Sequence, residues 1–332
     1  MARLGDTTLP SRQSRDLARA KRIEWISILY LLSCVVIVFL VMGNSQAMKV
    51  AWIEDMLSLV PPILFLASIH HARKRADRCH PYGHHRASAS AHLGASVALL
   101  AMGVFLVLDS GSGLLAGDHP TIGTMNLFGH TIWAGWPMVA AMLYTGIGPV
   151  VLGRMKLPLA DSLHDKVLYA DADMNKADWQ TAAAAIVGVL GIGIGLWWAD
   201  AAAALLIAVS ILKDGISGVR AAIKDLTDTR VRTHDDEAPH PLIEQTEAEL
   251  LRQRWVADGA VRIRDLGHVF HVEAFAVPKD PGRVDLAGLE NARDRIAELD
   301  WKLADVVVVP VREVPRHLQE EPEDTEAREE RA

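Results

Sequence analysis

Long apolar stretches constrain this chain more than any other feature of its sequence. A helix needs about 20 mostly apolar residues to cross a bilayer, because lipid offers no hydrogen-bond partner to free backbone groups. Six stretches of the chain meet this requirement, at approximately residues 25–43, 50–69, 90–108, 131–152, 179–197 and 199–223. The sequence therefore predicts an α-helical membrane protein with six transmembrane helices.

The second stretch is the weakest of the six. It carries Glu54 and Asp55 and the pair Pro61-Pro62, all of which are unfavourable in a lipid-facing helix. On hydropathy alone it could also be a buried interfacial helix, and we interpret it as the second span.

Basic residues indicate the orientation of the spans. They gather in the N-terminal tail and in segments 73–86 and 154–166, whereas segment 109–130 has no Lys or Arg and segment 44–49 has one. Loops rich in Lys and Arg stay in the cytoplasm. We therefore expect a multi-pass protein of the cell (inner) membrane with both termini in the cytoplasm. The polar, basic residues 1–22 do not resemble a signal peptide.

The chain is half hydrophobic yet 23% charged, which fits a membrane part joined to a water-soluble part. Beyond residue 226 the pattern predicts a helix at 244–258, strands at 260–266 and 268–277, a helix at 286–299 and a strand at 305–311. This α-β-β-α-β order predicts a small α+β, ferredoxin-like cytoplasmic domain with its helices on one face of the sheet. The expected organisation is a basic tail at 1–22, the membrane domain at 23–225, the α+β domain at 226–315 and an acidic disordered tail at 316–332.

Acidic residues in or beside the spans are candidates for cation ligands, since charge inside a membrane usually faces a polar cavity or a partner. Glu54 and Ser58 lie one helical turn apart in the second span. Asp178 lies at the expected start of the fifth, with Asp171 and Asp173 just before it. These two could equally be headgroup-region residues at a helix end. Pairs of ligands on two facing helices would form a cage for a divalent cation.

A second cluster lies in the loop after the second span. Segment 77–85 contains a carboxylate, a thiol and three imidazoles, and its Pro81 and Gly83 favour a sharp turn that would bring Asp77, His80 and His84 together. The alternative is a basic loop that touches anionic lipid, and the two interpretations are compatible.

The string Asp-x-x-His-Pro-Tyr-Gly-His, residues 77–84, resembles the HPYGHGK loop motif of the cation diffusion facilitator (cation efflux) family. The resemblance extends to the six spans, to Asp200 at the start of the last one and to the segment 225–228 that leaves the membrane. It implies export of divalent metal from the cytoplasm in exchange for protons, by a homodimer that alternates access to the two sides.

The family's transport site consists of two pairs of the form Asp/His-x-x-x-Asp. By resemblance, these pairs fall on Glu54 with Ser58 and on Met174 with Asp178, so that Asp55 or Asp173 would have to supply a further ligand. The transported metal is expected to be one of Zn, Mn, Fe, Co or Cd. Because these two pairs contain no histidine, the assignment to zinc is weakened, and manganese, iron or cobalt are the remaining options. Met174 could be a soft ligand or a packing residue.

The resemblance also predicts ligands outside the spans. Asp77, His80 and His84 occupy the family's loop positions, whereas Glu273, Glu290 and Val309 stand where relatives carry the histidines of a dimer-bridging metal site. His268 and His271 lie nearby and are interpreted as hydrogen-bonded strand residues. A cytoplasmic domain with a weakened or absent metal site is therefore expected.

The expected function is efflux of a divalent metal, and the alternative is a non-transporting metal-responsive or scaffolding membrane protein of the same fold. No nucleophile with its base and no phosphate-binding loop is visible in the sequence, so we expect neither an enzyme nor a prosthetic group. The soluble part is acidic, which argues against nucleic acid as a partner.

Overall fold

The computed structural model describes residues 10–72, 78–80, 86–117, 122–127, 130–163, 165–233, 238–267, 269–303 and 305–319. The chain divides into two compact units. The helical unit consists of Ser11–His70 and Ala87–Leu226, and the C-terminal unit is built mainly from Thr227 onward.

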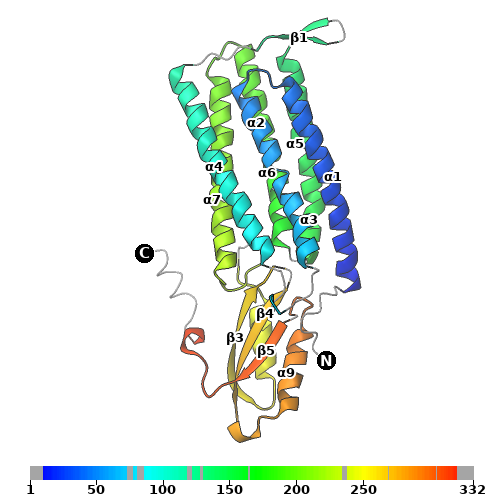
Figure 1. Cartoon of the computed structure of the whole chain (residues 1–332), viewed down its shortest axis with the longest axis vertical. Helices are drawn as coiled ribbons and strands as arrows, with labels where there is room; N and C mark the ends of the chain where they lie inside the picture. The colour runs from blue at the N-terminus through cyan, green and yellow to red at the C-terminus, as the bar shows by residue number, and fades with distance from the viewer. Residues whose placement is uncertain are drawn as a thin grey trace. The chain divides into compact units, whose positions relative to one another are not determined.

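Long helices that lie side by side form the helical unit (Figure 1). Its helices are α1 (Ser11–Val41), α2 (Gln46–Leu57), α3 (Val60–Ala72), α4 (Ala87–Ala116), α5 (Gly135–Leu163), α6 (Lys166–Gly193) and α7 (Ala199–Leu226). Within the described residues, five helical segments are long and apolar enough to cross a membrane, and α2 and α3 together count as one of them. The protein is therefore a multi-pass membrane protein, and α6 is the predicted span that falls outside these five.

The helix α6 explains that difference. It begins at Lys166, not near residue 179, because Asp165 caps it and accepts hydrogen bonds from the backbone N–H groups of Val167 and Leu168, both at 3.0 Å. Its first half therefore includes the polar segment that we expected to precede the span. Asp178 lies inside the helix, and the prediction that it marks the helix entrance is wrong.

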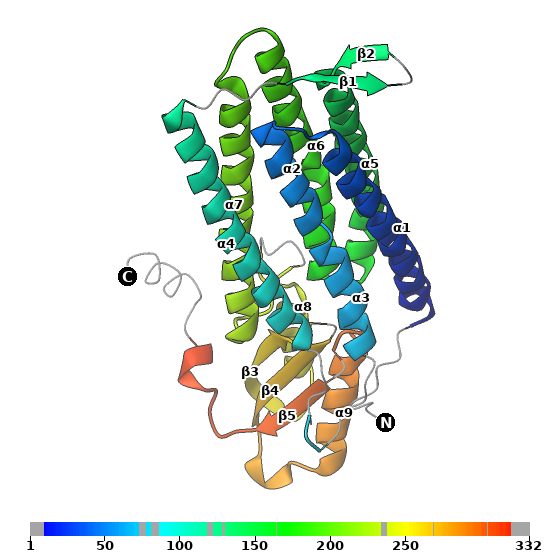
Figure 2. The same ribbon diagram turned by 45° about the horizontal axis from the view of Figure 1, so that its top comes forward.

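The fourth predicted span also has different bounds. Residues 131–133 belong to a short antiparallel hairpin of β1 (Thr124–Leu127) and β2 (His130–Trp133), and α5 begins at Gly135 (Figure 2). Thr131, Ile132 and Trp133 are β-branched or aromatic, which suits a strand. At its other end α5 continues to Leu163, so the segment predicted as a basic loop is largely helical.

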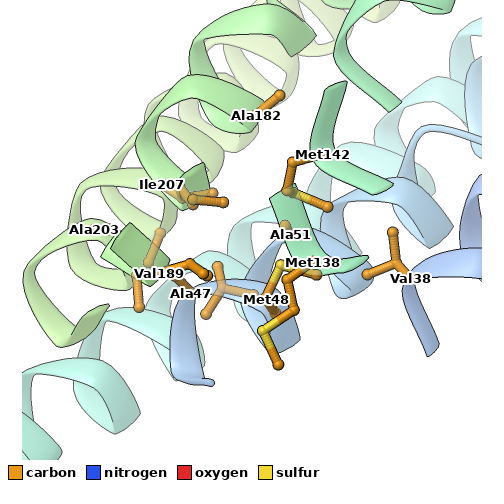
Figure 3. Packing of buried hydrophobic residues seen from close by; sticks show 14 of the residues in the cluster. Val38, Ala47, Met48, Ala51, Met138, Met142, Ala182, Val189, Ala203 and Ile207 are labelled. Atoms are coloured by element: carbon orange, nitrogen blue, oxygen red, sulfur yellow. The ribbon is translucent and has the colours of Figure 1, made fainter. Parts of the chain in front are cut away.

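Small and flexible apolar side chains fill the centre of the helical unit (Figure 3). They include Val38, Ala47, Met48, Ala51, Met138, Met142, Ala182, Val189, Ala203 and Ile207, from five different helices. Glycines let α4 and α7 approach closely: a Cβ on Gly103 would lie 2.8 Å from the Cα of Leu212, and one on Gly215 would lie 2.7 Å from the Cα of Leu100. The helices therefore meet at backbone distance, where a larger side chain has no room.

The C-terminal unit contains a three-stranded sheet in the order β3-β4-β5. Its elements are α8 (Leu242–Leu251), β3 (Val256–Asp265), β4 (Phe270–Pro278), α9 (Leu286–Ala297) and β5 (Asp305–Pro310). β3 pairs with β4 antiparallel and β4 pairs with β5 parallel. The helices α8 and α9 contact β3 and β5 respectively and also each other, so they cover one face of the sheet (Figure 1). The chain order α-β-β-α-β is the one that the sequence pattern predicts.

Within the predicted disordered tail, Arg316–Leu318 form a short 3-10 turn that Pro315 precedes. Residues 320–332 lie outside the described part of the chain. The predicted disorder of the tail therefore stays a prediction.

Candidate metal site

The position of α2 is fixed by an acidic residue of α7. Asp200 is fully buried, and its carboxylate accepts hydrogen bonds from the hydroxyl of Ser45 and from the backbone N–H of Gln46, both at 2.6 Å. Ser45 is also the N-cap of α2 and accepts from the N–H of Met48 at 3.1 Å. Asp200, at the start of α7, therefore holds the first turn of the helix that carries Glu54.

Glu54 is the centre of the candidate site. The hydroxyl of Thr181 on α6 donates to Glu54 Oε1 at 2.9 Å, and Asp178, one turn before Thr181, interacts electrostatically with Glu54. Glu54 Oε2 is buried and has no hydrogen-bond partner among the described residues. The structure thus brings together the two carboxylates that the sequence places on separate spans.

Two further carboxylates interact electrostatically with Asp178. Asp55 and Asp214 both lie within electrostatic range of Asp178, and Asp55 Oδ2 is a second buried oxygen for which the described chain offers no hydrogen-bond partner. Asp214 comes from α7 and was missed from the sequence, although an acidic residue inside the last apolar stretch is a usable signal. Thr181 was missed as well, because a threonine in a span is usually a packing residue.

Ser58 and Met174, the other two residues of the predicted ligand pairs, are less directly involved. The hydroxyl of Ser58 donates to the backbone carbonyl of Glu54 at 3.0 Å, so it also closes the end of α2. Met174 is half-buried one turn before Asp178, and Asp173 is exposed. Across the described residues, no three His, Cys, Asp or Glu side chains are grouped closely enough to form a metal site by themselves.

Asp171 has a role different from both predictions. The ammonium of Lys156 on α5 donates to Glu24 on α1 at 2.9 Å and to Asp171 on α6, and all three residues are buried. Asn175 donates to the backbone and side-chain oxygens of Asp171, at 2.8 and 3.2 Å. Asp171 is therefore neither a headgroup residue nor a free ligand, and Lys156 belongs to the core instead of a basic loop.

The loop cluster falls mostly outside the described residues. This applies to Asp77 and His84, whereas His80 is described and exposed. The predicted loop site therefore stays a prediction.

In the C-terminal unit, His271 forms polar contacts at both ring nitrogens. Its Nδ1 lies 2.5 Å from a carboxylate oxygen of Asp305 and its Nε2 lies 3.2 Å from one of Glu273. Since a carboxylate only accepts, both contacts are satisfied when the ring carries two protons. The bond to Asp305 raises the pKa of His271, burial opposes the rise and the bond to Glu273 adds to it. His271 is thus a hydrogen-bonded strand residue, as expected, and His268 lies outside the described residues.

Comparison with known proteins identifies the class. The model of the cation efflux transmembrane domain family matches residues 23–227, and the chain belongs to this family. It is 26% identical over 198 residues to the uncharacterized transporter YdbO of Bacillus subtilis, covering 60% of this chain and 64% of that protein. It is 23% identical to the manganese efflux system protein MneS of the same organism, covering 59% of this chain and 64% of the relative. For the manganese efflux system protein MneP the identity is 25%, over 69% of this chain and 73% of the relative. The chain thus spans less than two thirds of the length of YdbO and of MneS.

Proposed function

We propose that this protein exports a hard divalent cation, with Mn²⁺ as the first candidate, through a site between α2 and α6. The observation that supports the proposal is the pair Glu54 and Asp178, which come from two helices and interact electrostatically. One buried oxygen of Glu54 has no hydrogen-bond partner within the described chain. Oxygen ligands suit Mn²⁺ better than they suit Zn²⁺, which favours imidazole and thiolate. The names of two relatives, both manganese efflux system proteins, support this choice of cation.

Protons are the proposed counter-substrate. Glu54, Asp55 and Asp178 interact electrostatically, and several carboxylates in a poorly hydrated site are costly unless a cation or protons neutralise them. A metal ion binds only to deprotonated carboxylates, so metal and protons compete for the same oxygens. Alternating exposure of the site to the two sides of the membrane would then couple metal export to proton entry.

The proposed membrane arrangement counts α6 as a span, the fifth of six along the chain. Its polar first half is compensated in the structure, since Asp171 pairs with Lys156 and Asp178 faces Glu54. An even number of spans places both termini on the same side of the cell membrane. The distribution of basic residues predicts that this side is the cytoplasm. A homodimer, the predicted loop ligands Asp77, His80 and His84 and the four-part division of the chain remain part of this proposal.

Proteoliposomes test the proposal directly. Purified protein would be reconstituted and Mn²⁺ flux measured under an imposed proton gradient, for the wild type and for Glu54→Gln and Asp178→Asn. Both variants keep side-chain size and remove a charge, and we expect each to lose most of the flux. The matched control is Asp109→Asn on α4, an exposed acidic residue that should leave the flux unchanged. Undiminished flux in both site variants would refute the proposal.

A second candidate function is a metal-responsive or scaffolding protein that does not transport. The observation in its favour is that the described acidic, His and Cys residues form no complete metal cluster. Absence of any metal-dependent flux from folded wild-type protein, together with retained Mn²⁺ binding, would favour this alternative.

A further inference from the structure

The hydroxyl of Thr181 bonds to another helix. Serine and threonine side chains inside helices commonly donate to a backbone carbonyl three or four residues earlier. Thr145 on α5 does so, with the carbonyl of Met142 as its acceptor at 3.2 Å. By contrast, Thr181 on α6 donates to Glu54 Oε1 on α2, at 2.9 Å. This hydroxyl therefore joins the two helices that carry the candidate site.

Small residues hold this part of α6 close to α5. A Cβ on Gly146 of α5 would lie 2.7 Å from the Cβ of Ala182, so a larger side chain has no room between the two helices there. Ala182 and Ala185 are buried in the core of the helical unit. Thr181 is β-branched, so its χ1 has few accessible values within a packed helix. The backbone and the side chain of Thr181 are therefore both restricted, and its hydroxyl is a firm anchor for Glu54.

Glu54 is held at its backbone and at one of its two carboxylate oxygens. Its carbonyl accepts from the backbone N–H of Ser58 at 2.8 Å and from the Ser58 hydroxyl at 3.0 Å. Its Oε1 accepts from Thr181, whereas Oε2 is buried and has no hydrogen-bond partner among the described residues. A flexible side chain loses conformational entropy when it binds a ligand. With these bonds in place, much of that ordering is present before a cation binds.

The bond from Thr181 makes the two oxygens of Glu54 different. A carboxylate binds a cation either through one oxygen or through both. The bond favours the first mode, because Oε1 would otherwise have to serve the hydroxyl and the cation together. Ca²⁺ takes about six to eight oxygen ligands in flexible geometry and readily binds both oxygens of a glutamate. The smaller Mn²⁺ suits octahedral sites, in which single oxygens from different groups fit well.

We propose that Thr181 is a positioning residue that contributes to cation selectivity: its hydroxyl holds Glu54 Oε1, so that Glu54 binds the transported cation through Oε2 alone, which favours Mn²⁺ over Ca²⁺. This inference rests on the proposed function and extends it to the choice of cation. Thr181 acts through Glu54 and does not itself bind the cation. Removing a group that hydrogen-bonds to a metal ligand typically lowers the metal affinity by about 10–100-fold.

The variant Thr181→Val tests the inference, because valine keeps the branched shape and removes the hydroxyl. Calorimetry on the full-length protein in detergent would give the Kd for Mn²⁺ and for Ca²⁺. We expect the Kd for Mn²⁺ to rise about tenfold or more and that for Ca²⁺ to change by less than about threefold, so that the preference for Mn²⁺ falls. Thr181→Ser, which restores the hydroxyl, should recover most of the Mn²⁺ affinity. The matched control Thr145→Val removes a buried hydroxyl that bonds within its own helix and should change either Kd by less than about twofold.

A second measurement determines the binding mode in the wild type. In infrared difference spectra with and without Mn²⁺, the antisymmetric and symmetric carboxylate stretches are widely spaced when one oxygen binds and closely spaced when both bind. The bands of Glu54 are those that Glu54→Gln lacks, and we expect the wide spacing. The narrow spacing, or an unchanged ratio of the two Kd values in folded Thr181→Val while Glu54→Gln abolishes binding, would overturn the inference and leave the proposed function intact. Full flux in both Glu54→Gln and Asp178→Asn would instead refute the proposed function.

Discussion

Replacing Lys156 by methionine should destabilise the helical unit more than any single change at an exposed charge. Lys156 and Glu24 have fully buried side chains, and Asp171, the other partner of the ammonium, is 2% exposed. Methionine is close in length and fills most of the volume. It leaves two carboxylates buried together without a positive charge, so the change isolates the electrostatic contribution.

The magnitude follows from burial. Removing one partner of a buried ion pair costs about 3–5 kcal/mol, because the remaining charge stays desolvated. For a chain of this size each kcal/mol corresponds to about 2–4 °C in Tm, so a decrease of about 6–20 °C is expected. Neutralising the carboxylates as well, in Lys156→Met/Glu24→Gln/Asp171→Asn, should recover most of the loss, since a buried ion cluster contributes little net stability over neutral groups.

Thermal unfolding of the purified protein in detergent measures these differences. The control is Lys166→Met, which removes a lysine whose bond to Asp225 is 2.8 Å long but whose side chain is 25% exposed, as is that of its partner. A partly exposed ion pair of this kind contributes about 1 kcal/mol or less to stability. Equal losses in the two lysine variants, or a triple variant as unstable as Lys156→Met, would contradict the reasoning.

Three further outcomes are expected. Gly215→Val should lower the unfolding free energy by about 1–3 kcal/mol, because even a Cβ there lies 2.7 Å from the Leu100 backbone; Gly111→Val, at a position with open space, is the control in the same thermal assay. Asp200→Ala should cost about 1–3 kcal/mol, because it leaves the buried donors at the start of α2 without their acceptor, and it should also weaken Mn²⁺ flux; an undiminished flux would show that this anchor does not position the site. His271→Gln should destabilise the protein more at pH 6 than at pH 9. The pKa of His271 is raised in the folded state above its ordinary 6.5, so its contribution is full below that value and is lost as pH rises through the folded pKa. A pH-independent difference in Tm would contradict this assignment.

Much of the fold could be predicted because its signals are local. Apolar length indicates the membrane-crossing segments, and the alternation around residues 260–277 indicates the paired strands. The bounds of α5 and α6 could not be predicted in this way. Charged residues extend both helices beyond their apolar parts, and Lys156 is tolerated only because Glu24, 132 residues away in sequence, pairs with it. A hydropathy profile is local, so it does not show a pairing between residues that are far apart in sequence.

The candidate site shows the same division. Glu54 and Asp178 were predicted, since carboxylates inside spans are rare enough to be informative. The hydroxyl of Thr181, which orients Glu54, could not be distinguished from a packing residue. Pro61 and Pro62 are visible in the sequence as unfavourable for a span, but the sequence does not show that α2 ends at Leu57.

The pairing of Glu24 with Lys156 also constrains how the chain is assembled during synthesis. Helix α1 is synthesised first. More than a hundred further residues are made before Lys156 of α5, the partner of Glu24, is synthesised. An unpaired carboxylate in hydrocarbon is costly, so we expect nascent α1 to keep Glu24 at the water interface or protonated until then. We therefore expect α1 to dock after α5 and α6, which carry Lys156 and Asp171, have inserted.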